Sequence, residues 1–73
     1  MSDLPQVSGH AAVKAFGRAG FSKERQSGSH AILKKEGFPL LLTVPLHEEL
    51  KRGTLRHLIR DAGMTVDEFC ANL

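Results

Sequence analysis

The segment RQSGSHAIL, residues 25–33, places an imidazole, His30, between a glycine-serine turn and an apolar run. An imidazole can accept or donate a proton near neutral pH. Cleavage of RNA needs both transfers, because the 2′-OH loses a proton as it attacks the adjacent phosphate and the 5′-oxygen gains one as it leaves. Cations stabilise the additional negative charge of that transition state. His30 is therefore the first candidate for a proton-transfer group.

Residues around His30 match the needs of a phosphate backbone. A glycine without a side chain permits close approach, a serine offers a hydroxyl, and two cations lie on adjoining expected strands. These RNA-binding candidates are Arg25, Gly28, Ser29 and Lys34. On the residues alone, the alternative is a polar histidine at a strand end with no chemical role.

The other three histidines have weaker surroundings. His47 follows the residues VPL in the loop after the third expected strand, where an auxiliary role in proton transfer and an exposed position without a role fit equally well. His10 begins one expected helix and His57 lies inside another, and we assign neither a function. No two histidines have the i, i+4 spacing of a helical metal site, and the one cysteine, Cys70, has no partner. The sequence therefore predicts no metal site and no cofactor.

Positive charge is concentrated in the middle of the chain. All ten lysines and arginines lie within residues 14–60 with four of the eight acids, so this window carries +6 in a chain of net charge +2. Such a distribution favours an anionic partner, of which nucleic acid is the usual large one. The segment KRGTLRHLIR adds four candidates for an RNA-binding surface: Lys51, Arg52, Arg56 and Arg60.

Apolar spacing and turn residues predict the secondary structure. Three strands are expected, at residues 21–26, 30–35 and 40–44. One helix should precede them, between an N-cap at Ser8 and a stop at Gly20. Another should follow at 55–62, capped by Thr54, before a short last helix opened by the capping box TVDE.

This order predicts an α+β fold. It is the α-β-β-β-α sandwich of double-stranded-RNA-binding domains (dsRBD-like), with a short C-terminal helix and both main helices on one face of a three-stranded antiparallel sheet. We expect a single domain over residues 1–73, with residues 1–7 as a flexible N-terminal arm. The side chains expected to point inward are Val13, Phe16, Leu33, Leu41, Leu55, Leu58, Ile59, Phe69 and Leu73.

Composition limits the class of protein. The chain has 73 residues, of which 41% are hydrophobic, so it can bury a thin core. No apolar run approaches the roughly 18 residues of a membrane span, and the first residues do not have the pattern of a signal peptide. A single cysteine excludes an internal disulfide and fits a reducing compartment. We therefore expect a cytoplasmic protein with no membrane partner.

Four short motifs occur in order: AGF at 19–21, RxxGSH at 25–30, VPxH at 44–47 and GTLxxLI at 53–59. Over about residues 8–70 the chain thereby resembles the HicA (YcfA-like) family of mRNA interferase toxins. The resemblance implies an endoribonuclease toxin of a type II toxin–antitoxin system that acts in stress responses, with His30 as its catalytic residue. It also implies a HicB-type antitoxin that covers the active face. The chain departs from the family pattern at Ala31, where a histidine or bulky residue is frequent, and at Leu46, often polar or basic.

Two other functions stay open at this point. A non-catalytic dsRBD-like module that binds RNA fits the expected layout and the basic start of the second helix. The shortage of aromatic residues argues against base stacking on its sheet. A protein-binding adaptor is the third possibility, and an absence of RNA affinity at low salt would favour it, because phosphate contacts are strongest there.

Overall fold

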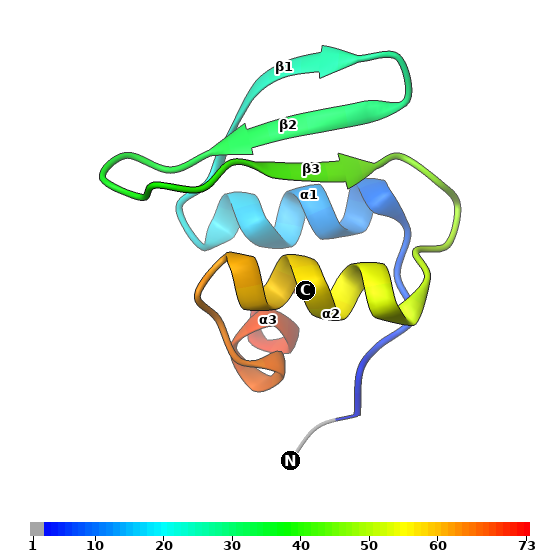
Figure 1. Ribbon diagram of the computed structural model, residues 1–73. Helices are drawn as coiled ribbons and strands as arrows, with labels where there is room; N and C mark the ends of the chain where they lie inside the picture. The colour runs from blue at the N-terminus through cyan, green and yellow to red at the C-terminus, as the bar shows by residue number, and fades with distance from the viewer. Residues whose placement is uncertain (1–2) are drawn as a thin grey trace.

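The computed structural model describes residues 3–73, which form three helices and three strands. In chain order these are α1 (Gly9–Arg18), β1 (Ser22–Ser27), β2 (His30–Lys34), β3 (Leu42–Pro45), α2 (Arg52–Asp61) and α3 (Val66–Ala71). The order confirms the predicted α+β arrangement with a short C-terminal helix. Figure 1 shows the sheet on one side and the helices gathered on the other. No helix within residues 3–73 is long and apolar enough to cross a membrane.

Helices α1 and α3 begin where capping residues predict. The Ser8 hydroxyl accepts a hydrogen bond from the backbone N–H of Ala11 at 3.0 Å, which satisfies one of the free donors of the first turn. At α3 the Thr65 hydroxyl accepts from the N–H of Glu68 at 3.1 Å, and the Glu68 carboxylate accepts from the N–H of Thr65 at 2.8 Å. This reciprocal pair is the predicted capping box.

Helix α2 begins at Arg52, three residues before the predicted start, so the predicted cap at Thr54 is wrong. Lys51 occupies the N-cap position and makes no capping hydrogen bond with its side chain. A tertiary contact determines the start instead. Leu50 is buried, and its N–H donates to the carbonyl of Val7 at 2.8 Å, which fixes the chain just before the helix.

The N-terminal segment is attached to the core within the described residues. Leu4 is buried, and its carbonyl accepts a hydrogen bond from a guanidinium nitrogen of Arg52 at 3.4 Å. One buried leucine and two backbone carbonyls, those of Leu4 and Val7, thus contact the rest of the fold, and the flexibility of the arm stays a prediction. The other two residues of the predicted arm, 1–2, lie outside the described residues.

The sheet is antiparallel in the order β1-β2-β3. A two-residue turn, Gly28 and Ser29, joins β1 to β2, and a positive φ of 59° at Gly28 but not at Ser29 is the type II′ pattern. Residues 35–41 join β2 to β3, with Gly37 at a φ of 77° making the predicted reversal. The hairpin turn is thus placed directly before His30.

Burial differs sharply between the two faces of the sheet. The side chains of Ala31, Leu33, Leu42 and Val44 are at most 1% exposed, because they lie against the helices. In the helical layer Phe16 packs against Phe69, with ring centroids 5.1 Å apart. The largest fully buried side chains are Phe16, Phe69, Leu33, Leu42, Leu55 and Val44.

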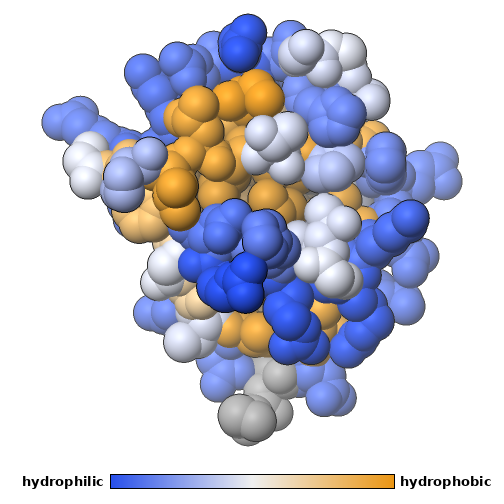
Figure 2. All heavy atoms as spheres, in the orientation of Figure 1, coloured by the Kyte–Doolittle hydropathy of each residue, from blue (hydrophilic) through white to orange (hydrophobic). Residues whose placement is uncertain are grey.

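The core confirms most of the predicted inward residues and corrects two. Leu41 is 57% exposed, because β3 begins at Leu42 and strand alternation then directs Leu42 and Val44 inward. Leu73 is 51% exposed, because it follows the end of α3 and no longer lies on a helical face. Val13 is half-buried at the margin of the core. Figure 2 shows hydrophobic side chains exposed over the β2–β3 connection and the start of β3.

Candidate functional site

His30 lies on the face of the sheet that no helix covers. Along β2 the side chains of Ala31 and Leu33 are buried against the helices, so His30, Ile32 and Lys34 point the other way. His30 and Lys34 are both exposed. Because a residue of a strand advances about 3.3 Å, His30 and Lys34 stand roughly 13 Å apart along β2.

Strand pairing adds the neighbours of His30. Residues directly opposite each other in an antiparallel sheet share a face. Ser27 lies opposite His30 on β1, and Pro45 lies opposite it on β3. Arg25 lies opposite Ile32, two residues from Ser27 along β1, and points to the same face of the sheet. The open face therefore comprises Ser22, Arg25, Ser27, His30, Ile32, Lys34, Thr43 and Pro45.

The β1–β2 turn leaves the approach to His30 unobstructed. A Cβ added at Gly28 would meet no atom within 4 Å, so the space beside this residue is open. The carbonyl of Gly28 accepts a hydrogen bond from the Gln26 side chain at 3.3 Å, which braces the turn. The positive φ explains the glycine by itself, so a role in admitting RNA stays a prediction.

The imidazole of His30 has no fixed protein partner in the part of the chain that the structure describes. Within residues 3–73 no hydrogen bond or ion pair joins its ring nitrogens to another side chain. The strand backbone fixes the position of His30, whereas no hydrogen bond or ion pair within residues 3–73 fixes the orientation of its ring.

Segment 45–47, which carries the second candidate histidine, is hydrogen-bonded to two other parts of the chain. The N–H of Leu46 donates to the carbonyl of Ser29 at 2.7 Å, next to His30. The carbonyl of His47 accepts from the N–H of Gly9, the first residue of α1, at 2.9 Å. His30 and His47 therefore belong to adjacent segments at one end of the sheet. In the described part of the chain, no three histidine, cysteine or acidic residues gather as metal ligands.

The sequence of the folded region matches a known protein family. A family model described as the HicA toxin of bacterial toxin–antitoxin systems matches residues 9–64. The matched region is more than half of the chain and includes α1, the whole sheet and α2. The chain belongs to the HicA toxin family. HicA toxins act in toxin–antitoxin systems, so an antitoxin is the partner of this one. No curated protein matches the chain in a direct sequence comparison.

In this HicA-family chain the cations of α2 form a second basic group. Leu55, Leu58 and Ile59 point into the core, so Arg56 and Arg60 lie on the outer side of the helix. The α2 cations, all exposed, are Lys51, Arg52, Arg56 and Arg60. They belong to the helical layer, on the side of the sheet opposite the open face (Figure 1). The structure therefore does not bring them together with His30.

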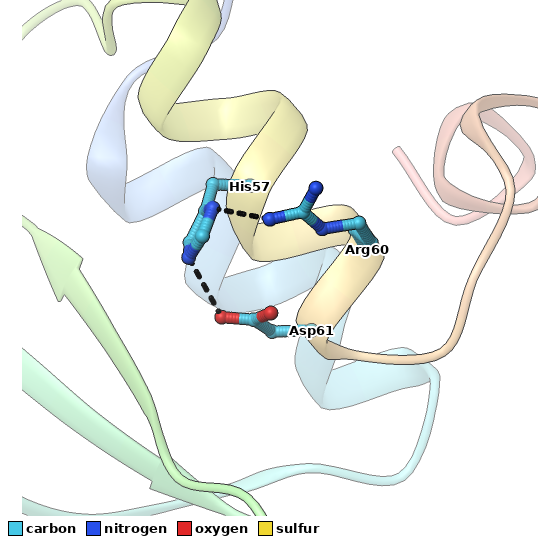
Figure 3. A network of polar contacts seen from close by, with 3 residues as sticks. All are labelled: His57, Arg60 and Asp61. Carbon is cyan, nitrogen blue, oxygen red and sulfur yellow. Dashed lines mark hydrogen bonds and ion pairs between the residues drawn. The ribbon is translucent and has the colours of Figure 1, made fainter.

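Two of the α2 cations already have partners within the HicA-family fold. Arg52 bonds the carbonyl of Leu4, as described above. A guanidinium nitrogen of Arg60 lies 2.9 Å from Nδ1 of His57, and Nε2 of His57 lies 3.3 Å from a carboxylate oxygen of Asp61 (Figure 3). These contacts restrain three neighbouring side chains on the outer surface of α2.

A hollow of about 360 Å³ lies between β3 and α2. Its lining residues are Thr43, Gly53, Thr54, His57 and Leu58. Neither His30 nor His47 lines it, and both candidate proton-transfer groups of this HicA-family chain are exposed. An open surface suits a polymer backbone, because phosphates are held by cations and hydrogen bonds without enclosure.

Sequence reasoning missed two features of the site region. The first is Gly9, whose backbone contacts segment 45–47; a glycine directly after a helix N-cap was the available signal. The second is the pairing of His57 with Asp61, which their i, i+4 spacing on a helix predicts.

Proposed function

We propose that this HicA-family toxin is an endoribonuclease that cleaves mRNA, with His30 as the catalytic residue. One observation carries the proposal: His30 is an exposed imidazole on the uncovered face of the sheet, with the cation Arg25 on the neighbouring strand. The backbone of β2 pairs with strands on both sides, so His30 has a well-defined position from which to meet a phosphodiester.

The chemistry requires two proton transfers around one phosphate. A base removes the proton of the 2′-OH, and the 2′-oxygen forms a bond to phosphorus as the bond to the 5′-oxygen breaks. An acid gives a proton to the 5′-oxygen, so the products are a 2′,3′-cyclic phosphate and a 5′-OH. His30 performs one of these transfers, and His47, on the adjacent segment, is the candidate for the other.

Cations of the open face stabilise the reaction in this proposal. Arg25 is close enough along the sheet to neutralise charge that develops on the phosphate at His30. Lys34, roughly 13 Å along β2, contacts a different phosphate of the same strand. Gly28 and Ser29, in the turn beside His30, contact the backbone of the RNA there. The α2 cations hold more distant parts of the RNA.

A second function has an observation in its favour. Within residues 3–73 no protein group orients the ring of His30, and a catalytic imidazole usually has such a partner. Binding of RNA without cleavage fits an imidazole that serves only as a contact. The two functions differ in whether the purified protein breaks RNA.

The test compares His30→Ala with a matched control, His57→Ala. Both histidines are exposed, but His57 lies on α2 and lines the hollow between β3 and α2, whereas His30 lies directly after the β1–β2 turn. His30→Ala should lower the cleavage rate about 10²- to 10⁴-fold, the usual contribution of an acid–base group, and should remove growth inhibition. His57→Ala should leave both unchanged. Growth, RNA integrity and thermal melting are measured for each variant and the wild type.

Two outcomes separate the alternatives. A folded His30→Ala protein that degrades RNA at the wild-type rate would exclude His30 as the catalyst. Pure wild-type protein that binds RNA but leaves it intact would support the binding module. Binding of the antitoxin by His30→Ala should persist, because one exposed side chain contributes little to folding.

A further inference from the structure

Gly9 occupies a place where a side chain does not fit. A Cβ built on this residue would overlap the carbonyl oxygen of Pro45 and lie 2.7 Å from Cα of Leu46. The φ of Gly9 is not positive, so its backbone conformation is available to any residue. The glycine is thus required by close approach of two backbones and not by a turn.

Two backbone hydrogen bonds link α1 to segment 45–47 and segment 45–47 to the β1–β2 turn. Gly9 donates its N–H to the carbonyl of His47, and Leu46 donates its N–H to the carbonyl of Ser29. His30 follows Ser29 directly and lies opposite Pro45 in the sheet. The first turn of α1 therefore contacts segment 45–47, which carries His47 and lies beside His30 in the sheet.

We propose that Gly9 is a positioning residue that sets the place of His47 relative to His30. The inference rests on the proposed function, in which these two side chains share the proton transfers. Gly9 itself touches no substrate; it acts through the backbone of segment 45–47.

The difference in burial between α1 and segment 45–47 predicts which of the two would move. α1 is held by Ala12, Ala15 and Phe16, whose side chains are 0% exposed. Segment 45–47 is less constrained, since Pro45 and Leu46 are half-buried and His47 is exposed. A methyl group at Gly9 should therefore displace segment 45–47 and change the place of His47 relative to His30.

The matched control lies in the same helix. A Cβ at Gly17 would meet no atom within 4 Å, so Gly17→Ala adds the same methyl group without a clash. Gly9→Ala should lower kcat for RNA cleavage about 10²-fold, since misplacement of a catalytic group by about 1 Å has effects of that size, with KM changed less than about twofold. Gly17→Ala should leave both constants unchanged. Equal kcat values for the two variants would overturn the proposal.

A double-mutant cycle with His47→Ala separates positioning from general damage. If Gly9 acts through His47, adding Gly9→Ala to His47→Ala should lower kcat less than about threefold further. A full 10²-fold loss in the His47→Ala background would show that Gly9 acts elsewhere and would overturn the proposal.

Imidazole NMR resonances provide a readout that needs no activity. Gly9→Ala should shift the ring signals of His47, and by less those of His30, while the signals of His57 stay in place. Gly17→Ala should shift none of them. If the wild type cleaves no RNA, the proposed function fails, but these shifts still decide whether Gly9 positions the two rings; unchanged His47 signals would overturn that.

Folding of the variant is checked in two backgrounds. Gly17→Ala raises the helix propensity of α1 and so supplies a stabilised background for Gly9→Ala. Thermal melting should show a folded protein in at least that background. Loss of the fold in both would make Gly9 a determinant of the core and would overturn its assignment as a positioning residue.

Discussion

The open face and the outer surface of α2 are both basic, but they differ in the contacts of the histidine that each one carries. On the open face Arg25 and Lys34 share the sheet surface with an exposed imidazole, which lies on a strand paired on both sides. On α2 the charges accompany a histidine that already contacts Arg60 and Asp61. The open face therefore has an unpaired proton-transfer group, within the described residues, and α2 does not.

This difference teaches that clustered charge in a sequence does not locate the proposed reaction. The sequence places all eight candidates, six cations and two turn residues, within one basic window. Strand register and helix burial divide them into two layers. Chemistry and general RNA affinity can thus be altered separately.

Among the cations, the largest effect should come from Arg25, which lies on the strand paired with His30. Arg25→Ala should lower kcat for RNA cleavage about 10²-fold, because a positioned positive charge at the reacting phosphate is lost. Arg56→Ala, which removes the same charge from α2, is the matched control and should change kcat little. Single-turnover cleavage at saturating protein measures both. Equal losses would remove the distinction between the two regions.

Replacing α2 cations should weaken binding without altering chemistry. Arg52→Ala with Arg56→Ala should reduce the dependence of RNA affinity on salt by up to about two phosphate contacts, uniformly across sequences. Affinity is measured at several salt concentrations with His30→Ala protein, which leaves the RNA intact. An unchanged salt slope would exclude these two residues as phosphate contacts.

The two arginines should differ in their effect on stability. Arg52→Ala should lower the free energy of unfolding by about 0.5–1 kcal/mol, since it removes the hydrogen bond to the Leu4 carbonyl. Arg56→Ala should stay within about 0.5 kcal/mol, as exposed substitutions usually do. Urea denaturation of each variant provides the values. A larger effect at Arg56 would contradict the contacts described for the N-terminal segment.

The smallest effect is expected at His57. Its contact with Asp61 is an exposed i, i+4 pair, with side chains 61% and 34% accessible, and such pairs contribute about 0.3–0.5 kcal/mol at most. His57→Ala should therefore change the unfolding free energy by less than about 0.5 kcal/mol. A loss above 1 kcal/mol in urea denaturation would show that the network of Figure 3 is a structural element.

The sequence predicted those parts of the fold that depend on local signals. Ser8 and the Thr65–Glu68 capping box mark helix starts because a side chain satisfies the backbone within one turn. The start of α2 could not be predicted in this way, because it depends on Leu50 and Val7, which are distant in sequence. Leu41 was placed inward for a similar reason: a one-residue difference in strand register exchanges the two faces.

The exposure of His30 was predictable from the sequence, whereas the grouping of the candidate residues was not. A histidine after a glycine-serine turn is visible in the sequence, and strand alternation then exposes it. The separation of the α2 cations from the open face follows from how the layers pack, which no local pattern encodes. Gly9 was missed because the sequence shows a glycine but not the carbonyl of Pro45 against it.

All six residues of β1 are exposed, and this has a consequence for the protein's motions. With few apolar contacts to hold it, an edge strand of this kind opens at a lower free energy than the rest of the sheet, so its amides should exchange with deuterium first. β1 carries Arg25 and pairs with the start of β2 at His30. A molecule bound across the open face would suppress the opening of β1. Slower deuterium exchange at residues 22–27 would then report that the site is occupied, without any covalent step.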